Sequence, residues 1–219
     1  MTLVPPKKAN VTPKTGRQPR GQVVYDKLLA AVERLIVEMG PEQISIVDVL
    51  AAGGVARATL YHHFGDLDAL IGEACVELFG KQVRADIDVI EALMNASKTS
   101  AEFAGKLNQI TEASQSPERK QFRVLRARLI AFAIARPRVE ERLSQCQSEL
   151  TDRLANVMAS AQERGLVRTD IDSRAAAVFV QAYTLGRIID DIASEKVEPA
   201  AWVHLIACTV TEALISSSD

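Results

Sequence analysis

Apolar residues recur at the 3.6-residue spacing of helices along most of the chain, and no alternating strand pattern persists. The first periodic segment has its apolar positions at Val24, Leu28, Val32, Leu35, Ile36 and Met39 and ends at Gly40-Pro41. A long segment runs from about Asp66 toward Met94. Further helices are expected near residues 99–114, 117–135, 137–165, 173–194 and 199–216, separated by Pro, Gly or Ser. The pattern predicts an all-α fold.

Between Ser45 and Phe64 the chain reads S-I-V-D-V-L-A-A-G-G-V-A-R-A-T-L-Y-H-H-F, which predicts two short helices joined by a glycine turn. Ser45 and Asp48 have the spacing of a capping box, and Gly53-Gly54 permits a tight turn. The second helix is expected from about Ala56 to His62, with Leu60 and Phe64 on one face and polar side chains on the others.

Guanidinium, hydroxyl and imidazole groups on an exposed helix face can donate to phosphates and base edges. We therefore interpret the segment as a helix-turn-helix that enters a DNA groove, with Arg57 and Thr59 reading bases. The candidate DNA-contacting residues are Ser45, Arg57, Ala58, Thr59, Tyr61, His62 and His63.

The run G-V-A-R-A-T-L-Y-H-H-F-G-D-L-D-A-L resembles the helix-turn-helix signature of the tetracycline-repressor (TetR) family of bacterial transcriptional regulators. The resemblance covers roughly residues 22–82. It implies a three-helix DNA-binding domain there, with the helix-turn-helix at about 45–64, and a helical effector-binding and dimerisation domain over 83–219. The implied function is a repressor that a small hydrophobic effector releases from a palindromic operator. A ligand-responsive activator on the same fold, and a ligand-binding helical protein that does not read DNA, are the alternatives.

Three positions depart from the family pattern. Ala56 replaces the usual serine, so the second helix lacks a side-chain cap that typically contributes about 1 kcal/mol. Leu67, flanked by Asp66 and Asp68, replaces a lysine that commonly clamps the DNA backbone. Leu50 replaces a small alanine, which suggests altered packing between the two helices. Phosphate affinity must therefore come from elsewhere.

The N-terminal arm, residues 1–21, is one source of positive charge. Its cations are Lys7, Lys8, Lys14, Arg17 and Arg20, with prolines at 5, 6, 13 and 19. Through Phe64 there are eight Lys or Arg against five Asp or Glu, whereas the remainder has 18 against 23. Such an arm is not expected to fold alone. It either follows DNA phosphates, as basic arms of other helix-turn-helix proteins do, or serves as a solvated tail.

The last two predicted helices carry apolar residues on more than one face, so one face can pack inward while another needs a partner. By resemblance, the family pairs these helices with their two-fold mates. The candidate interface residues are Phe179, Leu185, Gly186, Ile189, Trp202, Leu205, Ile206, Thr209 and Leu214. A fully buried helix pair within one chain is the alternative. A homodimer would place two reader helices about 34 Å apart on a palindrome.

An apolar cavity is expected between the DNA-binding helices and this interface, and in the family such a cavity usually binds a small molecule. The candidate lining residues are Phe103, Leu107, Phe122, Leu125, Arg126, Leu129, Phe132, Phe179 and Tyr183. This composition favours an apolar or amphipathic effector, with Arg126, Arg187 or Asp190 fixing its orientation. Each of these side chains also suits an ordinary core position.

Catalytic and metal motifs are lacking. His62, His63 and His204 do not form H-E-x-x-H, and the chain contains no G-x-S-x-G, P-loop or G-x-G-x-x-G run. We predict no enzyme, no cofactor and no metal. No apolar run approaches the length of a membrane span, so a cytoplasmic protein is expected. Cys75, Cys146 and Cys208 are widely separated, which favours buried reduced thiols over a redox sensor.

Overall fold

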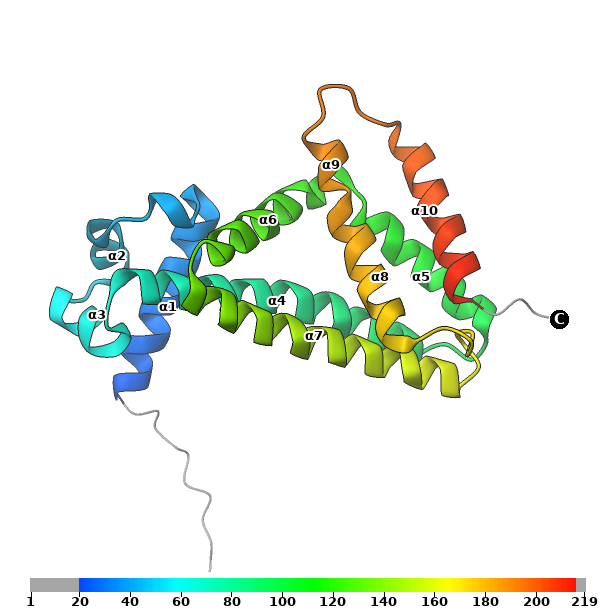
Figure 1. The fold of residues 1–219 in the computed structure, drawn as a ribbon, viewed down its shortest axis with the longest axis horizontal. Coiled ribbons are helices and arrows are strands. Elements are labelled where there is room, and N and C mark those ends of the chain that lie inside the picture. The colour runs from blue at the N-terminus through cyan, green and yellow to red at the C-terminus, as the bar shows by residue number, and fades with distance from the viewer. Residues whose placement is uncertain (1–19, 216–219) are drawn as a thin grey trace, which may run out of the picture.

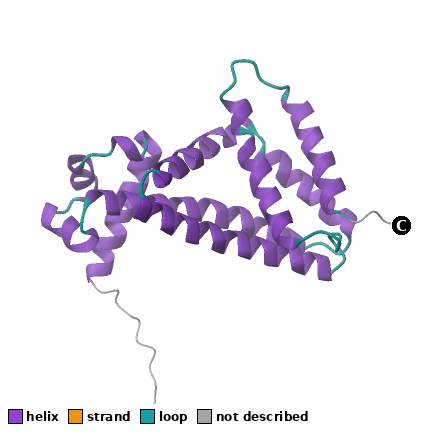
Figure 2. Ribbon diagram, in the orientation of Figure 1, coloured by secondary structure: helices purple, strands orange, loops and turns teal. Residues whose placement is uncertain are grey.

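The computed structural model describes residues 20–215, so the basic arm predicted for residues 1–21 lies outside them, apart from the two residues that open the first helix. Figure 2 shows helices joined by loops, and residues 20–215 contain no strand, which confirms the predicted all-α class. The elements are α1 (Arg20–Met39), η1 (Pro41–Gln43), α2 (Ile46–Gly53), α3 (Arg57–Phe64), α4 (Leu67–Asn95), α5 (Ser100–Ser114), η2 (Pro117–Arg119), α6 (Lys120–Ile134), α7 (Pro137–Glu163), α8 (Ser173–Gly186), α9 (Ile188–Asp191) and α10 (Pro199–Leu214).

The helices form two groups that α4 joins. α1, α2 and α3 gather around the first turns of α4, while α5, α8, α9 and α10 lie toward its other end (Figure 1). α7 runs beside α4 for most of its length, and α6 contacts both and rises from the start of α7 toward α9. Because α4 is continuous through residue 82, the predicted boundary between the two domains falls inside a helix rather than in a linker.

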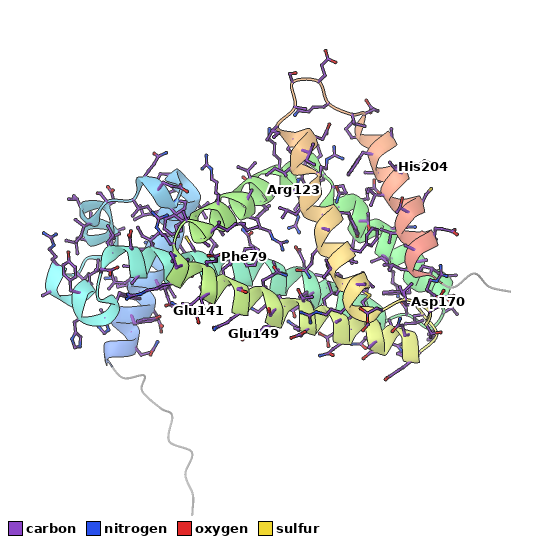
Figure 3. The ribbon with its side chains drawn as sticks, in the orientation of Figure 1. Phe79, Arg123, Glu141, Glu149, Asp170 and His204 are labelled. Atoms are coloured by element: carbon purple, nitrogen blue, oxygen red, sulfur yellow. The ribbon has the colours of Figure 1, made fainter. Side chains whose placement is uncertain are left out.

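The pattern of apolar residues explains why α4 is the central element. Its buried positions include Leu70, Ala74, Val83, Ile87 and Ile90, which follow helical spacing and form one stripe from the first group to the second. Phe79 is 2% exposed and lies between α4 and α6, as the side-chain view shows (Figure 3). No helix in the described part of the chain is long and apolar enough to cross a membrane.

The helix predicted over residues 173–194 is wrong as a single element. α8 ends at Gly186, and the short α9 follows after Arg187. Glycine weakens a helix interior, and the side chain of Arg187 is buried at only 4% exposure, so the chain turns here. The break places Asp191 against α6, which becomes important below.

A close approach between α4 and α7 makes Gly72 sensitive to substitution. A Cβ added there would lie 2.5 Å from Cγ2 of Val139, a distance that real side chains do not reach. We expect Gly72→Ala to lower the free energy of unfolding by about 1–3 kcal/mol, because overpacking outweighs the gain in helix propensity. Chemical denaturation measures this change.

Gly105 is the matched control, because it also lies inside a helix but a Cβ added there meets nothing within 4 Å. Gly105→Ala is expected to raise stability by about 0.5–1 kcal/mol through helix propensity alone. If both alanine variants were stabilised, the tight contact between α4 and α7 would be wrong.

Candidate DNA-binding surface and internal cavity

Local hydrogen bonds fix the two-helix unit. The amide N of Asp48 donates to Oγ of Ser45 at 3.3 Å, and the amide N of Ser45 donates to Asp48 Oδ2 at 2.9 Å, which completes the predicted capping box. Gly54 ends α2 in the left-handed region at φ 60°, a conformation that glycine adopts without strain. The chain then turns directly into α3.

Two apolar contacts set the orientation of α3. Leu60 is fully buried at 0% exposure, and the ring of Phe64 stacks on Tyr25 of α1 with centroids 4.6 Å apart and planes at 18°. Because these two residues are four apart, they lie on one face of α3, which packs against α4 and, through Phe64, against α1. The opposite face is left to solvent.

The opposite face carries the predicted contact residues. Arg57, Ala58, Tyr61 and His62 are exposed, whereas Thr59 and His63 are half-buried. Nη2 of Arg57 donates to the hydroxyl of Tyr61 at 3.3 Å, and its Cζ lies 5.6 Å from the ring centroid. The exposed side of α3 therefore presents a guanidinium, a phenol and an imidazole together.

Ser45 is placed differently from the other candidates. Its hydroxyl donates to Oδ2 of Asp48 at 2.6 Å and also accepts from the backbone of Asp48. The side chain thus already has partners within the cap of α2. A DNA contact by this residue would have to share that hydroxyl with the cap.

The departures at Ala56 and Leu67 have visible consequences. α3 has no side-chain cap at Ala56. Leu67 packs its side chain against the core, while Asp66 caps α4 by accepting from the amide of Ala69 at 2.7 Å.

Lys27 is an exposed cation that the sequence prediction missed, and it lies near the turn at Gly54 between α2 and α3. Nζ of Lys27 lies 3.4 Å from the position that a Cβ on Gly54 would occupy. Only the fold brings this residue of α1 there.

A cavity of about 620 Å³ lies among α4, α5, α6, α7 and α8. Its apolar wall includes Val83, Ile87, Ile90, Leu107, Ile110, Leu154 and Val180. The volume lies within the range of small-molecule sites, about 300–1,000 Å³. Phe122, 40% exposed, lies at the rim, so the cavity opens toward solvent at the α6 side.

Sequence reasoning identified part of the wall. Leu107, Phe122, Arg126 and Tyr183 line the cavity, but the other five candidates do not: Phe103, Leu125, Leu129, Phe132 and Phe179. Phe103, Leu129 and Phe132 are buried in the core, and Leu125 packs against it.

Helix geometry explains why some residues of η2 and α6 line the cavity and others pack in the core. Arg119, Phe122, Arg123 and Arg126 follow one helical stripe that faces the cavity. Leu125, Leu129 and Phe132 follow the neighbouring stripe, which packs inward. The cavity side of α6 is therefore richer in arginine than the sequence prediction assumed.

Arg123 lines the cavity and forms a buried ion pair with Asp191 of α9. Figure 3 labels Arg123 where α6 approaches α9. Nε of Arg123 donates to Oδ2 of Asp191 at 2.5 Å, and Nη2 donates to Oδ1 at 3.0 Å. Nη1 of Arg123 also donates to the carbonyl of Ser114 at 2.9 Å. The hydrogen bonds from Arg123 hold the pKa of Asp191 below its ordinary value although burial acts in the opposite direction. The pair ties α5, α6 and α9 together.

The other polar candidates have local partners. Nη2 of Arg187 and Oδ2 of Asp190 lie 3.6 Å apart, and neither residue lines the cavity. The hydroxyl of Tyr183 lies 3.1 Å from Oγ1 of Thr111, and burial raises the pKa of Tyr183. Of the three groups expected to orient an effector, Arg126 alone lines the wall.

The predicted interface residues divide into exposed and inward-facing groups. Ile189 is 75% exposed, Leu205 is 58% exposed, and Thr209 is exposed as well. Ile206 is buried within the subunit, and Nε1 of Trp202 donates to Oε1 of Gln115 at 2.8 Å, so both serve internal packing. Of the remaining candidates, Leu185, Gly186 and Phe179 are half-buried, and Leu214 is buried.

Two further exposed residues, Val178 on α8 and Ile192 at the end of α9, were missed. Val178, Ile189, Ile192 and Leu205 are here called the α8–α10 patch. Figure 3 shows His204 on the outer side of α10, one residue before Leu205.

The cysteines do not all fit the prediction of buried thiols. Cys75 is buried, and desolvation raises its pKa to about 12, so its thiol stays protonated. Cys146 is half-buried. Cys208 is exposed, with its Sγ 3.7 Å from Nε2 of His204, because it lies on the outer face of α10. Residues 20–215 contain no group of three or more His, Cys, Asp or Glu arranged to hold a metal ion.

Comparison with known proteins agrees with this geometry. Residues 28–74 match the family described as bacterial regulatory proteins, tetR family. No curated protein matches the chain significantly in sequence.

Solved structures share the fold over nearly the whole chain. GusR of Salmonella enterica has a TM-score of 0.63 at 18% identity, covering 90% of this chain and 98% of its own. A protein from Mesorhizobium loti, described as a TetR-family transcriptional regulator, has a TM-score of 0.63 at 15% identity, covering 89% and 96%. A protein from Saccharomonospora viridis, described as a transcriptional regulator and solved with choline, has a TM-score of 0.62 at 15% identity, covering 90% and 100%.

Proposed function

The chain is a member of the tetR family of bacterial regulatory proteins, and we propose that it is a homodimeric repressor that a small-molecule effector releases from a palindromic operator. The observation that carries the proposal is the exposed face of α3. Leu60 and Phe64 fix the opposite face, so Arg57, Tyr61 and His62 project together from the end of the molecule. A helix of this kind, held by its partner α2, suits the major groove.

Each side chain on this face has a distinct proposed role. Arg57 can donate two hydrogen bonds to a guanine edge, and Thr59 can contact a neighbouring base. Tyr61, His62 and His63 hold phosphates, and Lys27 at the turn adds a phosphate contact in place of the lysine that Leu67 replaces. The exposed hydroxyl of Tyr61 accepts a hydrogen bond from Nη2 of Arg57 at 3.3 Å.

Recognition of a palindrome needs two α3 helices, one from each subunit of a dimer. The residues of the α8–α10 patch are exposed apolar side chains on helices that lie away from α3, and a two-fold partner would cover them. Dimerisation through this patch would set the two α3 helices for successive major grooves, about 34 Å apart.

Ligand binding in the cavity would release the protein from DNA. α4 lines it with residues 81–90 and packs against α1 and α3 with its first turns. α6 lines it with Phe122, Arg123 and Arg126 and contacts η1 next to α2. A ligand that preferred a different arrangement of these two helices would shift both α3 helices away from the DNA-binding spacing. The choline complex of the Saccharomonospora viridis protein supports small-molecule binding on this fold.

Arg57→Ala tests the role of the guanidinium. We expect it to weaken binding to the preferred duplex by about 1–3 kcal/mol and to relax selectivity at one base position in each half-site. Fluorescence anisotropy with a panel of single-base variants measures both effects. Unchanged selectivity at every position would remove Arg57 from base reading.

Tyr61→Phe is the companion variant, because it removes a hydroxyl assigned to a phosphate. It is expected to weaken binding to all duplexes alike. A loss confined to one base variant would instead assign Tyr61 to base contact.

A second candidate is a ligand-binding helical protein that does not read DNA. The uncapped start of α3 at Ala56 and the inward packing of Leu67 favour it, since both remove contacts that the family uses. Salt dependence separates the two, because nonspecific DNA affinity falls steeply with salt, whereas base contacts keep one sequence bound more tightly than the others. An activator on the same fold would bind the same DNA and differ in operator position.

A further inference from the structure

The charged residues around the cavity differ in whether they have partners. Lys81 pairs with Glu33 at 2.7 Å and Arg119 pairs with Asp86 at 2.5 Å, both near the rim. Arg123 is bound by Asp191. Arg126 is the lining cation that forms no salt bridge with any residue in the range 20–215.

The guanidinium of Arg126 is also poorly satisfied in its hydrogen bonding. Its Nε is buried and donates to no acceptor in the described part of the chain. Its Cζ lies 4.9 Å from the ring centroid of Phe79, so an aromatic face is its main neighbour. Burial lowers the pKa of Arg126, yet an arginine keeps its charge in proteins. Arg126 as a whole is half-buried and its Nε is buried, with Asp86 as the nearby negative charge that acts on it. A bound anion that accepted hydrogen bonds from the guanidinium would offset the cost of holding this charge partly away from water.

The remainder of the wall indicates what accompanies the anion. Apolar side chains from α4, α5, α7 and α8 form most of the surface, and Asp86 is the only acidic residue among those that line it. Asp86 is already paired and its side chain is 56% exposed. Among residues 20–215, the lining of the cavity therefore has one positive charge without a salt bridge beside an apolar volume, and no unpaired carboxylate for a cationic ligand.

We propose that the ligand is an amphipathic monocarboxylate whose carboxylate is bound by Arg126 and whose hydrocarbon chain lies against Val83, Ile87 and Leu107. A planar carboxylate matches the guanidinium fork and can accept two parallel hydrogen bonds. The inference rests on the proposed function in taking this cavity as the effector site, and it specifies the effector's chemical class.

Calorimetric titration of the full chain tests the ligand class without DNA. The probes are decanoate, decan-1-ol and decyltrimethylammonium, which share a ten-carbon chain and carry a negative, neutral and positive head. Decanoate is expected to bind about tenfold or more tightly than decanol, as a hydrogen bond to a charged group implies. The cationic probe is expected to bind most weakly. Equal affinities for decanoate and decanol, or no binding of decanoate, would overturn the proposal.

Three variants separate a ligand contact from a structural role. Arg126→Met removes the charge but keeps apolar contact with Phe79, and Arg126→Lys keeps the charge. Arg168→Met removes a paired cation that does not line the cavity. Arg126→Met should lose about tenfold or more in decanoate affinity, keep its decanol affinity, and melt no lower than the parent without ligand. Arg126→Lys should recover part of the affinity, and Arg168→Met should change it less than about twofold.

The melting temperature is the informative readout. A residue that merely supports the fold would melt lower as methionine and would lose decanoate and decanol alike, which would overturn the proposal. A protein that did not bind DNA would give the same results in these titrations, which contain no DNA. The ligand proposal and the proposed regulator function can therefore be contradicted independently of each other.

Discussion

Asp191→Asn is expected to lower the free energy of unfolding by about 3 kcal/mol, because it leaves the guanidinium of Arg123 buried without a negative partner. Both side chains are nearly inaccessible, at 6% and 8% exposure, and the pair connects α6 to α9. Asparagine keeps one acceptor oxygen and the same shape, so the loss reflects the missing charge more than a cavity. Denaturant unfolding at fixed protein concentration measures it.

Asp170→Asn is the matched control. Asp170 also accepts two hydrogen bonds from one arginine, Arg168, at 2.6 Å each, but its side chain is 63% exposed. Solvent screens such a pair, so its loss should leave the unfolding midpoint nearly unchanged. Equal decreases in the free energy of unfolding of the two variants would contradict the claim that burial makes the Arg123–Asp191 pair important for stability.

The stability that the Arg123–Asp191 pair contributes should depend on pH. The pKa of Asp191 is depressed in the folded protein, so its contribution to stability is fully present above the unfolded-state value, about 3.9. The contribution is lost as the pH falls through the depressed folded value. The difference in stability between the parent and Asp191→Asn should therefore shrink below about pH 4 and stay constant above it.

Leu205→Glu is expected to convert the protein to monomers and to lower its affinity for a palindromic duplex by about 10² to 10⁴-fold. The reason is that Leu205 is the most exposed large apolar residue of α10, and a carboxylate in its place would be buried in the interface without a positive partner. Linking two subunits that each bind one half-site raises the overall affinity for the duplex by roughly 10² to 10⁴-fold. Sedimentation analysis and anisotropy measure the two effects.

Ile134→Glu provides the control, because Ile134 is 61% exposed on α6 and lies outside the α8–α10 patch. It should remain dimeric and bind DNA as the parent does. A Leu205→Glu protein that stayed dimeric with unchanged affinity would place the interface elsewhere.

Sequence alone predicted the helices well because proline and glycine mark their ends. Pro117, Pro137 and Pro199 each occupy the first turn of a helical element, where the missing amide proton costs nothing. The capping box at Ser45 and the glycine turn at Gly54 were equally readable. The break at Arg187 was not, because the apolar pattern continues through it and the cause is the burial of one arginine in the folded protein.

The cavity was harder to predict, for a physical reason. Periodicity shows that α6 has an apolar stripe but not whether that stripe faces a cavity or the core. Leu129 and Phe132 fill the core, while Arg123 and Arg126, on the adjacent stripe, line the cavity. Lys27 illustrates the same limit, since only the packing of α1 against α2 brings it near the turn at Gly54.

The most direct test of the central claim is selection of bound duplexes from a random pool by the full chain, repeated at two salt concentrations. A dimeric reader predicts a palindromic motif, with half-sites about 10 base pairs apart, that persists at the higher salt. A pool with no enriched palindrome, or binding that disappears uniformly as salt rises, would contradict sequence-specific reading by α3.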